Sequence, residues 1–223
     1  MTTGDPSTYY YRRNSAAANY QGDQIEKIDL SDVKLAHLSG IFAALSDKSL
    51  TAFKRLNQRL IEANILTTFD PNLRPALWNT QAEMIRVTNE LAKHSQVILP
   101  GVNEGEVLMG SRDPEEIADF YLDQGVETQV VVVKTGTAGA FIKTKAGRII
   151  RVPGFHVDQV VDTVGAGDGF AVGLITALLE GKSLVDAAKR GNAIGALAVQ
   201  SPGDNDGYPT PEQLERFINN VGG

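Results

Sequence analysis

Cysteine is absent from this 223-residue chain, which excludes disulfide bonds and metal sites built from thiolates. The same absence is typical of proteins in a reducing compartment, so we expect a cytoplasmic protein. Histidine occurs only three times, at positions 37, 94 and 156, and this spacing matches no metal-ligand motif. The sequence also offers no support for a P-loop or for a Ser/His/Asp catalytic arrangement.

Long hydrophobic runs and an excess of basic residues are also missing. No apolar segment approaches the ~20 residues that a helix needs to cross a bilayer, so we expect no membrane partner. The 27 Asp and Glu residues outnumber the 21 Lys and Arg residues, and the resulting net charge of −6 disfavours binding to nucleic acid. Hydrophobic residues make up 42% of the chain, which is ordinary for a globular protein with one sizeable core.

Strand-like and helix-like patterns alternate along the chain. The expected strands are apolar runs at 65–69, 96–99 and 128–134, followed by a hairpin of 139–144 and 148–152. The expected helices cover 49–63, 80–95, 114–124, 170–180 and 184–200, and a capping box at Thr210 opens a last one. This alternation predicts an α/β fold in which a mostly parallel, doubly wound sheet has helices on both faces.

The carboxyl ends of such strands are where ligands bind in open α/β sheets. Asp70 comes directly after an expected strand, Lys134 ends one, and Asn103 and the turn at 165–168 lie just after expected strands or at helix starts. We therefore expect these residues to meet at one edge of the sheet.

The most informative segment is Asp162–Phe170, which reads Asp-Thr-Val-Gly-Ala-Gly-Asp-Gly-Phe. Small residues let backbone N–H groups approach a ligand closely, and a helix that starts there adds its positive end. The segment therefore predicts a site for an anion such as phosphate. Because a carboxylate beside phosphate would repel it, we interpret Asp168 as a base that accepts the proton of an attacking hydroxyl.

These nine residues resemble the C-terminal signature of the PfkB (ribokinase-like) carbohydrate kinases. The resemblance implies a ribokinase-like fold, ATP as the phosphoryl donor and Asp168 as the general base. Gly165, Ala166 and Gly167 would direct backbone N–H groups at the charge that develops on the transferred phosphoryl group. Asp162 and Thr163 are expected to shape the turn, in a region that helps to hold a monovalent cation in some relatives.

Two further motifs carry the implied metal and nucleotide contacts. Asn103 and Glu106 resemble the family's Asn-x-x-Glu motif, which is associated with Mg²⁺ and phosphate. A carboxylate and an amide three residues apart at a helix start can order the water shell of Mg²⁺. The stretch from Lys134 to Ala140 resembles the Lys-x-Gly-x-x-Gly segment that lines the nucleotide site in relatives. Nucleotide contacts are expected from Asn103, Lys134, Gly136, Gly139, Gly165, Gly167 and Asn192, the last on a helix that relatives pack beside adenine.

The substrate is indicated by two arginines in characteristic surroundings. Tyr10 and Arg12 lie in a segment similar to the 2-keto-3-deoxygluconate kinase branch, where a tyrosine and an arginine contact the acid sugar. Arg74 stands where a second substrate arginine is expected, and the planar fork of arginine suits a carboxylate. The same Asp-x-Asn-x-Arg-x-x-Leu-Trp pattern also occurs in fructokinase-like members, so a fructokinase- or ribokinase-type kinase of a neutral sugar stays open as an alternative.

The chain matches only the later part of a complete family member. We expect residues 1–30 to be part of a small β lid that contacts substrate, and residues 31–223 to form the ATP-binding α/β core. The opening strands and the Gly-Gly sugar motif of the family are not found, so a non-catalytic nucleotide-binding fragment is a second hypothesis. Relatives often pair through their lid strands, which leaves a homo-oligomer open.

Overall fold

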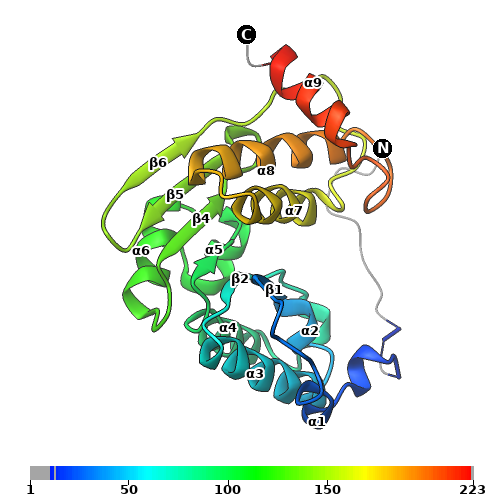
Figure 1. Cartoon of the computed structure of the whole chain (residues 1–223), viewed down its shortest axis with the longest axis vertical. Coiled ribbons are helices and arrows are strands. Elements are labelled where there is room, and N and C mark those ends of the chain that lie inside the picture. The colour runs from blue at the N-terminus through cyan, green and yellow to red at the C-terminus, as the bar shows by residue number, and fades with distance from the viewer. Residues whose placement is uncertain (1–10, 13, 222–223) are drawn as a thin grey trace.

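One six-stranded sheet forms the centre of the computed structural model, which describes residues 11–12 and 14–221 (Figure 1). The strands follow chain order across the sheet: β1 (Leu35–Ser39), β2 (Leu66–Asp70), β3 (Val97–Ile98), β4 (Val130–Lys134), β5 (Ala140–Thr144) and β6 (Ile149–Val152). The first four strands are parallel, and β5 and β6 add an antiparallel hairpin. The predicted mostly parallel sheet is confirmed.

Helices connect the strands and follow the last of them. They are α1 (Gly22–Ile25), α2 (Gly40–Ala43), α3 (Asp47–Glu62), α4 (Gln81–Ala92), α5 (Val102–Met109), α6 (Pro114–Gln124), α7 (Ala166–Leu179), α8 (Leu184–Ala198) and α9 (Pro211–Val221). Short 3₁₀ turns occur at Ala17–Asn19, Pro75–Leu77 and Gly136–Ala138. In the described part of the chain, no helix is long and apolar enough to cross a membrane.

The valines of β4 show how the sheet divides the core into two layers. Val131 and Val133 are buried with Phe53 of α3 and Tyr121 of α6, in a cluster that also includes α4 and α5. Val132 points to the other face and is buried with residues of α7 and α8. Because successive side chains of a strand point to opposite faces, one run of valines serves both layers. Helices therefore cover both faces, as the sequence predicts (Figure 1).

Residues ahead of β1 pack on α3. Ala18 and Ile25 are each 2% exposed, and the guanidinium of Arg59 donates hydrogen bonds to the carbonyls of Ile25 and Ile28. No strand occurs in residues 11–12 and 14–34, and residues 1–10 of the expected lid segment lie outside the described residues. Within the described residues, no strand pairs with the outer edge of β1.

The five helices predicted between residues 49 and 200 are present as α3, α4, α6, α7 and α8, with ends that differ from the prediction by at most four residues. The helix α6 has the predicted bounds, whereas α7 begins at Ala166, four residues before the first residue of its apolar pattern. Within α7, Gly173 lies so close to α8 that a Cβ would be 2.7 Å from Gly191 Cα. The two helices are therefore in backbone contact.

Replacing Gly173 by alanine should destabilise the protein by about 1–3 kcal/mol, because the added methyl group meets backbone atoms that have no alternative rotamer. Urea unfolding at pH 7 measures the effect. Gly22→Ala in α1 is the matched control, since the nearest atom to its added Cβ is 4.0 Å away. An unfolding free energy unchanged in Gly173→Ala would contradict the close packing of α7 on α8.

Candidate active site

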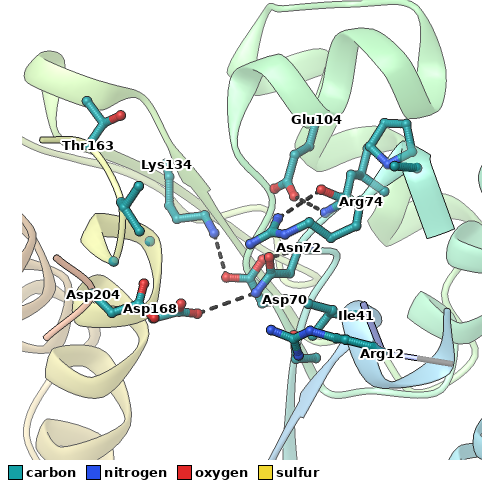
Figure 2. Close-up of a pocket in the computed structure, with 17 residues that line it drawn as sticks. Arg12, Ile41, Asp70, Asn72, Arg74, Glu104, Lys134, Thr163, Asp168 and Asp204 are labelled. Carbon is teal, nitrogen blue, oxygen red and sulfur yellow. Dashed lines mark hydrogen bonds and ion pairs between the residues drawn. The ribbon is translucent and has the colours of Figure 1, made fainter. Parts of the chain in front are cut away.

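A pocket of about 900 Å³ lies beyond the carboxyl ends of β1, β2 and β4 (Figure 2). The polar groups that line it come from the ends of these strands, from the first turns of α5 and α7, and from four segments outside helices and strands. They are Arg12, Ser39, Asp70, Asn72, Arg74, Glu104, Lys134, Thr163, Asp168 and Asp204. Parallel strands place their carboxyl ends at the same edge, which is why residues distant in sequence meet there.

A buried ion pair forms the floor of the pocket. Lys134 Nζ, at the end of β4, lies 2.6 Å from Asp70 Oδ2, at the end of β2. The Asp70 side chain is only 3% exposed, so its charge has little access to water. Burial by itself lowers the pKa of Lys134, but the carboxylates of Asp70 and Glu104 outweigh that effect and hold the pKa above the usual lysine value. Lys134 is therefore cationic at neutral pH.

Glu104 closes one side of the pocket at the start of α5. Its two carboxylate oxygens accept the N–H of Leu73 at 3.0 Å and the N–H of Gly101 at 2.8 Å. Burial raises the pKa of Glu104, the cation of Lys134 opposes this shift, and Asp70 adds to it. A carboxylate has about four lone-pair sites, so two N–H contacts leave Glu104 able to accept more.

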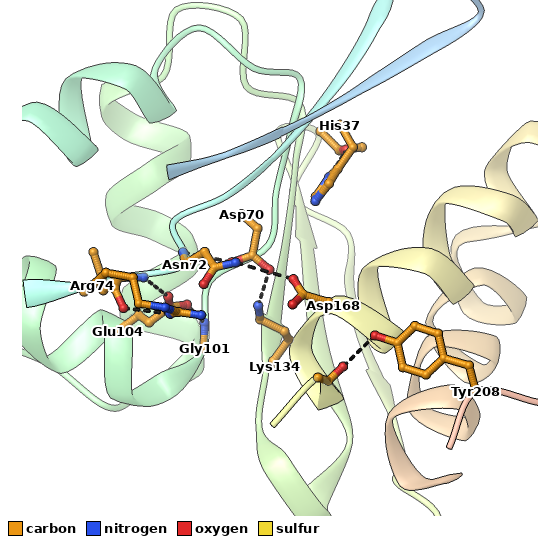
Figure 3. A network of polar contacts seen from close by, with 12 residues as sticks. His37, Asp70, Asn72, Arg74, Gly101, Glu104, Lys134, Asp168 and Tyr208 are labelled. Atoms are coloured by element: carbon orange, nitrogen blue, oxygen red, sulfur yellow. Dashed lines mark hydrogen bonds and ion pairs between the residues drawn. The ribbon is translucent and has the colours of Figure 1, made fainter. Parts of the chain in front are cut away.

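The N-terminus of α7 lies opposite Glu104. Gly165 precedes the helix with a φ of 79°, and a Cβ there would be 1.8 Å from the carbonyl oxygen of Asp204, so only glycine fits. The hydroxyl of Tyr208 donates to the Gly165 carbonyl at 2.8 Å and fixes the turn (Figure 3). Lys134 Nζ is 3.7 Å from a Cβ built on Gly167, so its charge adds to the free N–H groups of the first helical turn.

Asp168 faces the pocket from this first turn. Asn72 Nδ2 donates to Asp168 Oδ1 at 3.4 Å (Figures 2 and 3). Partial burial raises the pKa of Asp168 above the usual aspartate value, and the carboxylate of Asp70 raises it further. Lys134 and Arg74 lower this pKa and moderate the shift. The site thus holds a basic carboxylate beside a positively charged helix terminus.

The structure places six of the sequence-predicted site residues around this one pocket. They are Arg12, Arg74, Lys134, Gly165, Gly167 and Asp168. Ala166 is the first residue of α7, between the two glycines that line the pocket. Tyr10 lies outside the described residues.

Asn103 and Glu106 do not reach the pocket. Both are exposed on α5, and Glu106 pairs instead with Arg112 at 2.8 Å. The reason is helical geometry: neighbouring residues are turned by about 100°, so Glu104 faces the pocket while 103 and 106 face elsewhere. The pocket therefore gives no support to a metal site built from Asn103 and Glu106, which stays a prediction, and Glu104 is the carboxylate that α5 directs at the pocket.

The predicted nucleotide contacts beyond Lys134 have structural partners of their own. Gly139 has a φ of 100°, and a Cβ there would be 2.2 Å from the carbonyl oxygen of Val152. Asn192 is 8% exposed, and its amide nitrogen donates to the carbonyls of Val152 at 3.2 Å and Pro153 at 3.0 Å. Gly136 opens the 3₁₀ turn after β4. None of the three lines the described pocket.

Sequence reasoning did not identify Asn72, Glu104 or Asp204 as site residues. A signal for Glu104 existed: it is the third residue of a helix that starts directly after a strand, where a carboxylate caps the preceding N–H. Asn72 stands two residues after the strand-ending Asp70, in an Asp-Pro-Asn turn. No local pattern indicates Asp204, because only the folded loop brings it against Gly165.

A parallel α/β sheet with an anion-binding helix terminus, a buried lysine and a facing aspartate is typical of proteins that bind and transfer phosphate groups. Residues 1–211 match the pfkB family carbohydrate kinases, and the chain belongs to this family.

Relatives with assigned activities and solved structures are similar to this chain. It is 45% identical over 215 residues to a 2-dehydro-3-deoxygluconokinase of Bacillus subtilis, covering 96% of this chain but 65% of the relative. The crystal structure of a PfkB protein from Polaromonas sp. JS666 superposes with a TM-score of 0.81 at 40% identity, covering 96% and 68% of the two chains. A protein from E. coli assigned as a ribokinase II, in complex with ATP and Mg²⁺, has a TM-score of 0.84 at 26% identity, covering 98% and 69%.

Removing the cation of the buried pair should destabilise the protein strongly. Lys134→Met leaves the Asp70 carboxylate buried without its partner, which typically costs about 3–5 kcal/mol of unfolding free energy. Lys143→Met is the matched control: the Lys143 side chain is 16% exposed against 18% for Lys134, but its partners Glu115 and Asp119 are accessible to water. That control should cost about 1 kcal/mol or less.

Urea unfolding at pH 7 compares the two variants. The double variant Asp70→Asn/Lys134→Met should recover part of the unfolding free energy that Lys134→Met loses, because it has no unpaired buried carboxylate. Equal losses from Lys134→Met and Lys143→Met would show that burial of the pair has no special energetic weight.

Proposed function

We propose that this chain carries the catalytic site of an ATP-dependent kinase that phosphorylates a hydroxyl of 2-keto-3-deoxygluconate, also named 2-dehydro-3-deoxygluconate. The observation that carries the proposal is the position of Asp168, beside the Gly165–Gly167 turn and opposite Lys134. A base, an anion site and a cation then surround one point in the pocket. The similarity to the B. subtilis enzyme supports this reading over that of a neutral-sugar kinase.

In this proposal the residues around α7 handle the transferred phosphoryl group. Asp168 accepts the proton of the sugar hydroxyl, whose oxygen forms a bond to the γ-phosphorus as the bond to the leaving ADP oxygen breaks. Backbone N–H groups of Gly165, Ala166 and Gly167 and the ammonium of Lys134 stabilise the negative charge on the phosphoryl oxygens. Because the Gly165 turn is fixed by Tyr208, these donors are in place before the reaction.

Magnesium fits the charge balance of the pocket. Among the described lining residues, the carboxylates of Asp70, Glu104, Asp168 and Asp204 outnumber the cations of Arg12, Arg74 and Lys134. A triphosphate entering this pocket needs additional positive charge, which Mg²⁺ supplies by neutralising phosphate oxygens. Glu104 would hold the ion's water shell, since its carboxylate keeps free lone pairs on the side of the pocket.

An acid sugar fits the arginines of the pocket. Arg12 and Arg74 both line it, and the guanidinium of Arg74 is anchored by donating to the Leu73 carbonyl at 2.8 Å. The planar guanidinium retains further N–H donors for a substrate carboxylate. A neutral sugar would offer these guanidinium groups no carboxylate to bind.

The remaining roles stay predictions of the family resemblance. They are nucleotide contacts from Gly136, Gly139 and Asn192, a substrate contact from Tyr10, a monovalent cation near Asp162 and Thr163, a homo-oligomer and a cytoplasmic location. The side-chain NH₂ group of Asn192 donates to two backbone carbonyls, those of Val152 and Pro153. A nucleotide contact from this side chain would therefore involve its oxygen, Oδ1.

The first test is ADP release from ATP and Mg²⁺ with 2-keto-3-deoxygluconate, fructose or ribose as acceptor. Asp168→Asn should lower kcat by about 10²–10⁴-fold, because the amide cannot accept the hydroxyl proton. In the unmodified chain, kcat/KM should fall as the pH drops through a pKa that lies above the usual aspartate value, because only the ionised Asp168 is a base.

The residual activity of Asp168→Asn should lack this dependence. The unfolding free energy of the Asp168→Asn variant should not fall, since burial already disfavours the ionised carboxylate of Asp168. If the folded chain phosphorylates none of these sugars, the result would favour a non-catalytic nucleotide-binding fragment instead.

The acid-sugar assignment makes a separate prediction for Arg74. Arg74→Met should raise KM for 2-keto-3-deoxygluconate by about 10- to 150-fold, which corresponds to the ~1.5–3 kcal/mol of a hydrogen bond to a charged group. KM for fructose or ribose should change far less. Arg112→Met is the control, because Arg112 pairs with Glu106 away from the pocket. A loss of equal size with acid and neutral sugars would contradict a carboxylate contact.

A further inference from the structure

Asn72 has a backbone conformation that residues other than glycine rarely adopt. Its φ is 42°, and among the described residues only one other non-glycine residue, Asn64, has a positive φ. A conformation of this kind persists when the surrounding structure holds it, and it is common at functional sites.

Three contacts hold the turn that contains Asn72. Its own N–H donates to Asp70 Oδ1 at 3.1 Å, and the N–H of the next residue, Leu73, donates to Glu104 at 3.0 Å. The carbonyl of Pro71 lies against Gly40, where a Cβ would be 2.1 Å from the oxygen. The turn is thus fixed by a buried carboxylate, by a second carboxylate and by backbone packing.

The side chain that this turn presents is directed across the pocket. Asn72 Nδ2 donates to Asp168 Oδ1 at 3.4 Å, which joins the loop after β2 to the first turn of α7 (Figure 3). The distance is long for a hydrogen bond, but catalytic hydrogen bonds commonly shorten in the substrate complex. Lys134, the nearby cation, forms its ion pair with Asp70, so the side-chain hydrogen bond to Asp168 comes from the neutral amide of Asn72.

We propose that Asn72 is a positioning residue for Asp168: it holds Oδ1 so that Oδ2 faces the hydroxyl of the substrate. This role rests on Asp168 being the base of the proposed function. An amide suits the task better than a cation, because an opposite charge at this distance would lower the basicity of the carboxylate. A neutral donor orients the carboxylate and leaves it basic.

Other groups also act on Asp168, and the test must leave them in place. Asp70, Asp204, Lys134 and Arg74 all influence its ionisation, and Tyr208 and His37 lie within electrostatic reach of it. Substitution of Asn72 by glycine permits the left-handed backbone and removes the side chain with its amide donor. Substitution by aspartate replaces the donor with a second carboxylate of the same shape.

Asn72→Gly should lower kcat by about 10- to 100-fold with less than about a twofold change in KM for ATP, because the base loses its orientation while the nucleotide site is unchanged. The acidic limb of the kcat/KM profile should move to higher pH in Asn72→Gly and further in Asn72→Asp, since each removes a donor to the ionised form. Asn64→Gly and Asn64→Asp, at the other left-handed asparagine, should show neither effect.

A measurement without turnover separates this inference from the proposed function. The ¹³C signal of the Asp168 carboxyl, assigned by its loss in Asp168→Asn, reports the pKa of that group directly. The pKa should rise in Asn72→Gly and stay constant in Asn64→Gly, even if the chain phosphorylates no sugar. An unchanged titration in Asn72→Gly, or a kcat and pH limb equal to those of the unmodified chain, would overturn the role of Asn72.

Discussion

The buried ion pair between Lys134 and Asp70 is the contact on which the pocket depends. It joins the ends of β2 and β4, which are 64 residues apart in sequence, at 2.6 Å, in a place where Asp70 has almost no access to water. A charge buried in this way must be paired or the fold loses stability. The pair therefore holds the ends of two strands together, and hydrogen bonds continue from Asp70 to Asn72 and from Asn72 to Asp168.

The same pair sets the electrostatics of the site. Lys134 forms an ion pair with Asp70 and lies beside the first turn of α7, so one ammonium group contributes both to the fold and to the anion site. Burial and the neighbouring carboxylate of Asp70 raise the pKa values of Glu104 and Asp168, which keeps Asp168 more basic than an ordinary aspartate. A base and an anion site in one pocket are compatible because Lys134 and the helix terminus offset the repulsion between carboxylate and phosphate.

Much of the fold could be predicted from the sequence because its signals are local. Four valines in a row predict a buried strand, and Pro114 after an N-cap aspartate predicts the start of α6. The site was predictable where glycine and aspartate stand next to each other, as at 165–168. It was not predictable where a helix turns one residue toward the pocket and its neighbour away: Glu104 lines the pocket, while Asn103 and Glu106 are exposed. Asn192 is similar, since its amide is used by the backbone after β6.

The sequence by itself determined the order of strands and helices, the absence of thiolate chemistry and the turn before α7, because each depends on residues close together in the chain. Only the tertiary structure decided which side chains meet. Lys134 is paired with Asp70, Gly165 is pressed against the loop of Asp204, and Asn72 is held in a left-handed turn that directs it at Asp168. These contacts join segments 39 to 96 residues apart. Their geometry follows from the packing of the sheet and its two helical layers, which no local pattern contains.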